Sequence, residues 1–282
     1  MIASPLPSMQ LRGIGAWANG MPSWAAMRAV ARGEAELLAD APRRPSTDLL
    51  PPNERRRAPE TVLLALQVAQ AACMDASADP ATLPSVFASM HGDLTITDFM
   101  CQTLALSPKD ISPTKFHNSV HNAAAGYWTI GVGCRAAATA ISAFQATFAQ
   151  GLLEAAMQLA EGAPAVLLVA SDGPSVGPLA AVSRSIGLFG VALVLARDDA
   201  ANEGVRMHVE LLARSAPPPI HGRLFSILGG NAMAPALVLM QALALGEQEC
   251  VLDAGPDLSL ALRFSGHMSG HISGHISGHI SA

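Results

Sequence analysis

Positive charge and aromatic side chains are both scarce in this chain. Of its 282 residues only 17 are lysine or arginine, 4% are aromatic, and the formal net charge is −5. Nucleic-acid binding depends on basic patches and on aromatic platforms that stack on bases. The one basic run, Arg-Arg-Arg at 55–57, is too short for such a patch. We therefore expect no nucleic-acid partner and interpret this run as residues that cap or flank a helix.

Cysteine is also rare, and its spacing carries no metal or disulfide signature. The four cysteines are Cys73, Cys101, Cys134 and Cys250, and no two are separated by only two residues. Zinc sites and disulfide frameworks depend on such close pairs or on histidine pairs next to cysteine. We expect reduced, mostly buried thiols, no metal and no other cofactor.

Long apolar runs are missing as well. The first 20 residues lack the basic segment and apolar stretch of a signal peptide, and no apolar run reaches the roughly 20 residues of a membrane span. With 50% hydrophobic and 14% charged residues, the composition is typical of a globular unit with a large core. We expect a cytoplasmic protein without a membrane span.

A low-complexity repeat ends the chain at 265–282. Histidines recur there every fourth residue, at His267, His271, His275 and His279. Evenly spaced imidazoles bind nickel or zinc weakly, and we interpret the repeat as an expression tag. The remaining residues, 1–264, are expected to form a single domain. Their five histidines are His91, His117, His121, His208 and His221.

Apolar residues alternate between helical and strand periodicity along the chain. This pattern predicts helices over 22–33, 59–76, 95–105, 146–161 and 231–246, and a turn followed by a helix over 111–133. It predicts strands over 8–20, 85–92, 137–144, 163–173, 187–196, 205–213, 249–253 and 258–264. A Pro- and charge-rich connection covers 41–59. Strands separated by long apolar helices indicate an α/β layered protein.

Gln145 stands where the strand 137–144 runs into the helix 146–161. In many enzymes this kind of junction holds a nucleophile, because the helix dipole stabilises a thiolate there. Glutamine is not a nucleophile at any ordinary pH. The junction therefore has the shape of a catalytic site without its reactive group.

The block from 112 to 172 resembles the β-ketoacyl-ACP synthases, which have the thiolase fold. Both have the same order of short motifs around the strand and helix that meet at Gln145. In this sequence the motifs are Ser112-Pro113, Asn122, Ala125-Gly126, Gly133-Cys134-Arg135, the strand 137–144, Gly162 and the apolar strand 165–170. The resemblance implies a layered α-β-α-β-α arrangement, here with a second half trimmed between 213 and 224.

The catalytic residues of that family have no counterparts here. A condensing enzyme uses a cysteine at the position of Gln145 and two histidines that assist decarboxylation and stabilise the enolate oxygen. Asn231 takes the place of one histidine, and the segment that holds the other is absent. Cys134 fits the nucleophile position only in a register that moves the following helix out of phase, so we place it in the loop before the strand. His221 lies in a Pro-rich loop and is expected at the surface.

Glutamine at the cysteine position also resembles the chain-length factors, the inactive partners of type II polyketide ketosynthases. The short chain resembles the chain-length factors of aryl polyene biosynthesis in particular. The resemblance implies a heterodimer with an active ketosynthase, contact with an acyl carrier protein, and an interface along 137–144. Tunnel and interface candidates are Phe116, Ala140, Phe144 and Gln145.

Two other functions remain open from the sequence. One is a homodimeric module that binds acyl carrier protein. The other is a decarboxylase or acyltransferase that uses Cys134 or His221. Activity of the isolated protein would identify a decarboxylase or acyltransferase. Co-purification with a ketosynthase would distinguish a chain-length factor from the homodimeric module.

Overall fold

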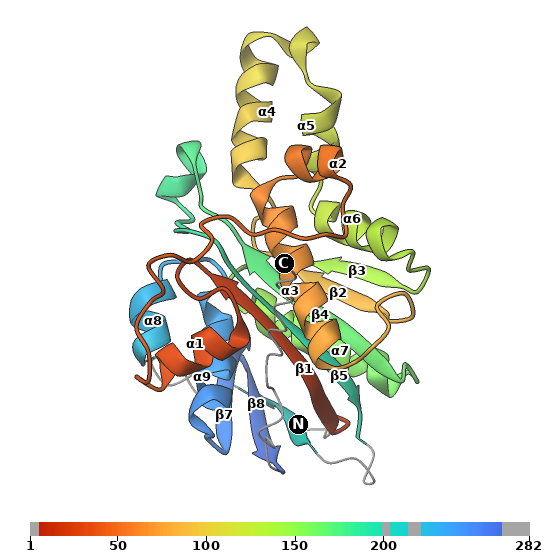
Figure 1. Ribbon diagram of the computed structural model, residues 1–282, viewed down its shortest axis with the longest axis vertical. Coiled ribbons are helices and arrows are strands. Elements are labelled where there is room, and N and C mark those ends of the chain that lie inside the picture. The colour runs from red at the N-terminus through yellow and green to blue at the C-terminus, as the bar shows by residue number, and fades with distance from the viewer. Residues whose placement is uncertain (1–5, 199–203, 214–220, 267–282) are drawn as a thin grey trace, which may run out of the picture.

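The computed structural model describes residues 6–198, 204–213 and 221–266 (Figure 1). Strands within these ranges form an eight-stranded mixed sheet with the order β3-β2-β4-β5-β1-β6-β8-β7. The strands are β1 Met9–Ala18, β2 Ser85–Ala88, β3 Ala138–Ile141, β4 Ala165–Asp172, β5 Phe189–Arg197, β6 Val205–Ala213, β7 Glu249–Gly255 and β8 Leu258–Ser265.

All helices of the described ranges lie between β1 and β8 in the chain. They are α1 Trp24–Ala31, α2 Pro52–Arg57, α3 Glu60–Asp75, α4 Leu94–Leu106, α5 Pro113–Asn118, α6 Ala123–Val132, α7 Thr147–Ala160, α8 Arg223–Leu228 and α9 Leu237–Leu245. Short 3₁₀ turns lie at η1 Pro108–Asp110, η2 Phe144–Ala146, η3 Gly177–Ala181 and η4 Ala234–Ala236.

The predicted α/β succession is confirmed, with differences at particular elements. Each predicted strand is present, although β2 and β3 are only four residues long. The single helix expected within 111–133 is two helices, α5 and α6, and α9 begins at Leu237 rather than near 231. Neither α2 nor α8 was predicted, because each is only six residues long and too short to show a clear period.

The expected pair of strands at 187–196 and 205–213 is not a hairpin. β5 pairs with β4 and β1, whereas β6 pairs with β1 and β8. The N-terminal strand β1 therefore lies between two strands that are neighbours in sequence. Most of the predicted Pro-rich loop and all of the tail after 266 lie outside the described residues.

Helix α3 covers one face of β1, β5 and β4, and α6 lies beside it over β2 and β3. It packs so closely on β1 that an added Cβ at Gly13 would lie 2.3 Å from the carbonyl oxygen of Ala72, and one at Gly15 would lie 2.0 Å from that of Val68. Any larger residue would force the helix away from the strand. Trp17, Leu64 and Trp128 are among the buried residues of this layer.

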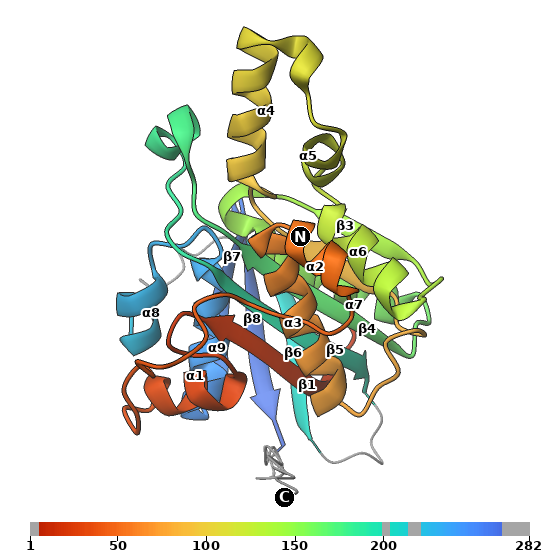
Figure 2. The same cartoon turned by 45° about the horizontal axis from the view of Figure 1, so that its top comes forward.

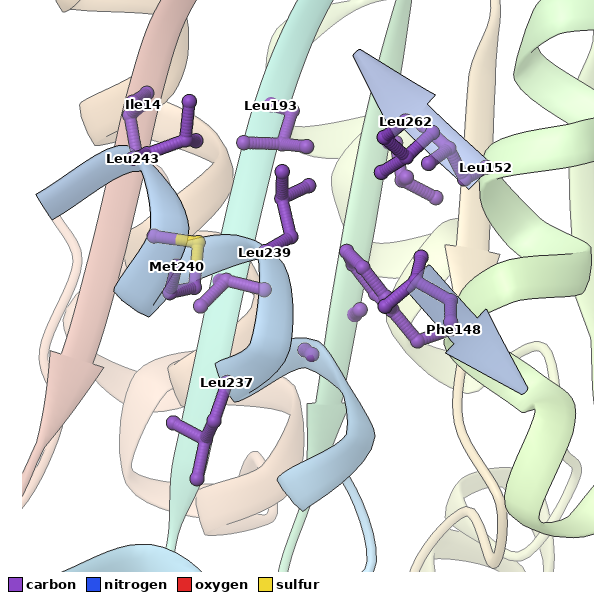
Figure 3. Packing of buried hydrophobic residues seen from close by; sticks show 14 of the residues in the cluster. Ile14, Phe148, Leu152, Leu193, Leu237, Leu239, Met240, Leu243 and Leu262 are labelled. Carbon is purple, nitrogen blue, oxygen red and sulfur yellow. The ribbon is translucent and has the colours of Figure 1, made fainter. Parts of the chain in front are cut away.

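Helices α7 and α9 cover the opposite face. Figure 3 shows Leu239, Met240 and Leu243 of α9 lying over the sheet, near Ile14 of β1 and Leu193 of β5. An added Cβ at Gly151 of α7 would lie only 3.0 Å from the Cβ of Ala88, so this helix also sits close to its strands. The predicted burial of α7 on most of its surface is confirmed by eight buried residues out of 14.

The second group of strands, β6, β8 and β7, has one covered face. Its buried side chains join the core of α7 and α9. On the other face, Arg263 lies 3.5 Å from Glu210 and 3.9 Å from Glu249 as exposed ion pairs. In the described ranges this face is only partly open to solvent, because Ser259 and Ala261 of β8 are buried on it. No helix in the described ranges has both the length and the apolar content needed to cross a membrane.

Candidate functional site

Polar side chains lie at the carboxyl ends of three neighbouring strands, β3, β2 and β4. β2 pairs with β3 and β4 in parallel, with Ala88 opposite Ile141 on one side and Ala170 on the other. Their carboxyl ends therefore lie at the same edge, a place where α/β proteins commonly bind ligands. Ser89 to His91 follow β2, Gln145 follows β3, and Asp172 ends β4.

Gln145 lies in the turn η2, between β3 and α7, as predicted. Its neighbour Phe144 has a φ of 51°, in the left-handed region that costs a non-glycine residue about 1 kcal/mol. The Thr147 hydroxyl holds this turn, since its oxygen donates to the carbonyl of Phe144 at 2.6 Å and accepts from the N–H of Ala143 at 2.9 Å. The strained turn is thus built into the local structure.

The Gln145 side chain is exposed next to the first turn of α7. A thiolate at this place would be stabilised by the positive end of the helix dipole. An amide cannot ionise there, and it supplies no nucleophile. The geometry of a nucleophile site is therefore present, while the chemistry of nucleophilic attack is absent at this residue.

The side chain of Asn231 is buried and hydrogen-bonds to the backbone of neighbouring segments. Its Nδ2 donates to the carbonyl oxygens of Gly187, Ile186 and Asp172 at 3.0, 3.2 and 3.3 Å. Its Oδ1 accepts from the backbone N–H of Met233 at 2.9 Å. These contacts tie the start of the α9 segment to the end of β4 and to the loop before β5. The side chain is fully used in holding the backbone.

Cys134 and His221 are not placed for catalysis at this edge. Cys134 is buried in the loop before β3, and its thiol donates to the carbonyl of Leu83 at 3.5 Å. Cys134 precedes β3 and Gln145 follows it, so the two residues lie at opposite ends of this strand. His221 is exposed before α8, and its carbonyl accepts from Gln241.

A buried carboxylate, which sequence reasoning did not single out, organises the loop after β2. Asp172 is 0% exposed and accepts hydrogen bonds from the Ser89 hydroxyl at 2.7 Å, the Met90 N–H at 2.8 Å and the His91 N–H at 3.1 Å. Burial raises the pKa of Asp172, and these hydrogen bonds together with the charge of His91 oppose that rise. The sequence feature that could have identified this residue was an aspartate at the end of a mostly apolar strand.

The imidazole of His91 faces a serine from another segment. Its Nε2 lies 2.6 Å from the Oγ of Ser183, in the connection between β4 and β5. The two loops are also linked to the Gln145 turn, because the Ser142 hydroxyl donates to the carbonyl of Met90 at 3.1 Å. In the described ranges no three His, Cys, Asp or Glu side chains converge as a metal site.

The strand β3 is an open edge of the sheet. The carbonyls of Ala137 and Ile141 accept from Ser85 and Ser89 of β2, so the intervening Ala138 and Ala140 direct their N–H and C=O groups away from β2. The four residues of β3, Ala138–Ile141, are exposed or half-buried. An open edge of this kind is a template for pairing with another strand.

Apolar side chains are exposed on the elements around this edge. Figures 1 and 2 show α4 and α5 projecting above the sheet as an arm, with the connection between β4 and β5 rising beside α4. Phe116 on α5 and Phe144 in η2 are each 61% exposed. Further exposed apolar residues are Phe99, Leu104, Leu106, Val120, Ile130, Leu179, Val182 and Ile186. Phe116 and Phe144 are therefore surface aromatics in this chain rather than core residues.

An open groove of about 850 Å³ lies between α2, α5 and α6. Its lining combines apolar residues such as Leu50, Val120 and Ile130 with the polar groups of His117 and Tyr127. Neither Gln145 nor Phe116 lines it. No sequence pattern predicted this groove, because it depends on helix α2, which was not predicted.

Comparisons with known proteins agree with this geometry. Residues 24–216 match the family model described as "Beta-ketoacyl synthase, N-terminal domain". Among curated proteins no sequence match is found. A chain of the Xenorhabdus doucetiae complex "Ketosynthase (ApeO) in Complex with its Chain Length Factor (ApeC)" shares 23% identity over 91% of this chain and 99% of its own, with a TM-score of 0.70.

Two further structures are similar at lower identity. One is "The ishigamide ketosynthase/chain length factor", with 16% identity, coverage of 92% and 100%, and a TM-score of 0.66. The other is AntDE:AntF, a type II polyketide acyl-carrier protein with its ketosynthase, with 14% identity, coverage of 93% and 100%, and a TM-score of 0.68. These similarities confirm the predicted thiolase-like fold.

The family model spans more than two thirds of the chain, and the strand, turn and helix around Gln145 have the arrangement that the resemblance implied. The chain belongs to the β-ketoacyl synthase family.

Proposed function

We propose that the chain is a chain-length factor, a subunit without condensing activity that pairs with an active ketosynthase. In the complex it would line part of the tunnel for the growing acyl chain, in the synthesis of an aryl polyene or a related polyketide. An acyl carrier protein would bring substrates to the complex. No cofactor is needed for this role.

The observation that carries the proposal is Gln145 in the turn between β3 and α7. The turn keeps the backbone geometry of a nucleophile site, with strain at Phe144 and support from Thr147, but its side chain cannot attack a thioester. Asn231, in the place of a catalytic histidine, is engaged with four backbone groups. A subunit with these residues depends on a partner for condensation.

The similar structures support the kind of partner. Two of them pair a ketosynthase with a chain length factor, and a third holds an acyl-carrier protein with its ketosynthase. The open edge of β3 and the apolar arm of α4 and α5 supply a surface that a subunit of the same fold would cover. We propose that β3 pairs with the equivalent strand of the ketosynthase.

The test is co-expression with a ketosynthase, followed by affinity capture and size-exclusion chromatography. The sharpest variant is Ala140→Pro, because the lost N–H points away from β2 and proline is tolerated on such an edge. We expect the variant to fold with a melting temperature close to that of the parent and to lose the complex. Ala140→Glu should also abolish the complex, since it places an unpaired carboxylate in an apolar interface at a cost of several kcal/mol.

A matched control lies on the opposite side of the sheet. Glu249→Pro changes the free edge of β7, which the proposal leaves outside the interface, and should leave the complex intact. A complex that survives both Ala140 variants would contradict the proposed interface. Product formation by the parent complex, but not by either subunit alone, would establish the division of labour.

Phe116 offers a separate test of the tunnel. If its exposed ring lines the shared tunnel, Phe116→Ala should lengthen the product and Phe116→Trp should shorten it, while the complex remains intact by chromatography. Phe99→Ala, on α4, is the matched control on the same arm. Unchanged product length in both Phe116 variants would exclude this residue from the tunnel.

A further inference from the structure

Two loops that are far apart in sequence bring a serine hydroxyl against an imidazole. The Ser183 Oγ lies 2.6 Å from the His91 Nε2, across 92 residues of sequence. His91 follows β2, whereas Ser183 follows η3 in the connection from β4 to β5. A serine and a histidine within hydrogen-bond distance are the basic unit of a nucleophile with its general base.

A buried carboxylate stands next to the histidine. Asp172 holds the loop of His91 by accepting from its backbone N–H at 3.1 Å. The same carboxylate binds Ser89 and Met90, so the position of the His91 loop is fixed from the end of β4. The imidazole of His91 is therefore carried on a fixed loop that faces Ser183.

The second ring nitrogen of His91, Nδ1, adds no hydrogen bond to the described residues, so the ring does not make every contact that would stabilise the fold. Nδ1 is buried and has no hydrogen-bond partner among the described residues. A buried polar atom without a partner costs about 1–3 kcal/mol, and such atoms in native structures call for a functional explanation. With hydrogen on Nδ1, Nε2 is free to accept the proton of Ser183.

A second serine and histidine pair in the chain lacks these features. The Ser8 Oγ lies 2.7 Å from the His208 Nδ1 on an exposed part of β6. The other ring nitrogen of His208 lies 3.3 Å from the Ser265 hydroxyl. Because distance alone is similar in the two pairs, Ser8 and His208 provide an internal control for the effect of the buried carboxylate.

We propose that Ser183 is an acyl-accepting nucleophile, with His91 as its general base. The Ser183 oxygen attacks the carbonyl carbon of an acyl thioester and forms a C–O bond, and the C–S bond breaks. The proton of Ser183 passes to His91 Nε2 and then to the departing sulfur, which leaves as a thiol. The product is an acyl ester on Ser183, and no oxidant or reductant is involved.

The surroundings of Ser183 suit an acyl chain. Val182 is 77% exposed and Ile186 is 53% exposed on the same segment, and Leu179 is 45% exposed. Arg184 is also exposed next to Ser183, where its guanidinium can attract an anionic carrier of the thioester. Ser183 itself is half-buried, so the hydroxyl is positioned by its neighbours without being sealed from solvent.

The experiment uses the full chain alone, with the hexanoyl thioester of N-acetylcysteamine as the probe. Intact mass gives the extent of acylation, and peptide mapping gives the site. We expect one hexanoyl group on Ser183, no adduct there in Ser183→Ala, and a rate that falls on the order of 100-fold in His91→Gln. His208→Gln and Ser8→Ala should acylate at the parental rate.

The dependence on pH provides a readout that a purely structural contact would not change. Acylation should accelerate as His91 loses its proton, and His91→Gln should remove this dependence. Asp172 of β4 interacts electrostatically with His91, and Arg184 follows Ser183 on the segment that faces the ring. Ser183→Cys keeps the shape of the site and should also acylate. It therefore distinguishes loss of the nucleophile from misfolding of Ser183→Ala.

The inference fails if Ser183 carries no adduct, or if His91→Gln acylates as fast as the parent. If wild type remains unmodified while Ser183→Ala and His91→Gln both lower the melting temperature, the contact is only a latch between two loops. The inference does not rest on the proposed heterodimer, which is measured by co-purification and not by acylation of the isolated chain.

Discussion

The turn after β3 and the loops after β2 and β4 leave the sheet at the same edge, yet they are built in opposite ways. Around Gln145 the side chains are exposed, and Phe144 presents its ring to solvent. Around Asp172 the polar groups are buried and most are hydrogen-bonded, with His91 and Asn231 tied to the same strand end. The turn of Gln145 is therefore open to solvent, while the neighbouring loops form a polar cluster around Asp172.

This difference has a physical consequence. A buried polar cluster stabilises the fold only when its members satisfy one another, so a single change there leaves unpaired groups in a dry environment. An exposed turn can change its side chain at little cost. We expect substitutions at the two places to separate by several kcal/mol in the free energy of unfolding, and the following changes test that separation in order of expected size.

Asp172→Asn should have the largest effect. The amide that replaces one carboxylate oxygen would face donors of the β2 loop, so at least one N–H or hydroxyl loses its acceptor. We expect a loss of about 3 kcal/mol in the free energy of unfolding, measured by urea denaturation. Asp48→Asn is the control, because Asp48 pairs with Arg55 at 2.8 Å but its side chain is 96% exposed; it should change stability by less than about 1 kcal/mol.

The same residue predicts a pH dependence. Burial raises the pKa of Asp172 in the folded protein, so the folded state holds this proton more tightly than the unfolded chain, whose value is about 3.9. Its contribution to the free energy of unfolding should therefore be fully present below about pH 4 and fall as pH rises through the raised pKa. The difference between wild type and Asp172→Asn across this window should show that slope, and a difference independent of pH would contradict it.

Asn231→Ala should have the next largest effect. It removes a buried amide that donates to carbonyls of Gly187 and Ile186 and accepts from Met233. We expect a loss of about 2 kcal/mol, together with faster hydrogen exchange of the Met233 amide. Asn53→Ala on the exposed helix α2 is the matched control and should be nearly silent. An unchanged free energy of unfolding in Asn231→Ala would show that these hydrogen bonds contribute little to stability.

Cys134→Ser should cost about 1–2 kcal/mol, because the hydroxyl is more costly to bury than the thiol. The activity of the complex with a ketosynthase should survive. Cys101 is exposed, so Cys101→Ser should leave stability unchanged, and iodoacetamide should modify Cys101 much faster than Cys134. Rapid modification of Cys134 would instead identify a reactive thiol and revive the acyltransferase interpretation.

Gln145→Cys should have the smallest effect on stability, within about 0.5 kcal/mol, because the side chain is exposed. If the proposed correspondence of Asn231 with a catalytic histidine holds, the isolated variant should remain without condensing or malonyl-decarboxylating activity. Carbon dioxide release from malonyl-ACP measures this directly. Condensation by the isolated variant would show that other residues of the second half replace the missing histidines.

Much of the fold was predictable from local pattern. The long helices α3 and α7 and the apolar strands β4 and β5 showed clear periodicity, and the junction at Gln145 followed from the spacing of its motifs. Short elements were missed, since α2 and α8 offer too few residues for a period to appear. The division of the α5 and α6 region was also missed, because α5 has only six residues and too few apolar positions for a helical period to appear.

The sequence by itself determined which residue stands at the junction of β3 and α7, that Cys134 precedes the strand, and that the chain alternates strands with apolar helices. These properties depend on neighbours within a few turns of chain. Only the tertiary structure decided that β1 lies between β5 and β6, that β3 is an open edge, and that Ser89 meets Asp172 across 83 residues and His91 meets Ser183 across 92. Such contacts form when distant segments share one core, and no local periodicity specifies which segments those are.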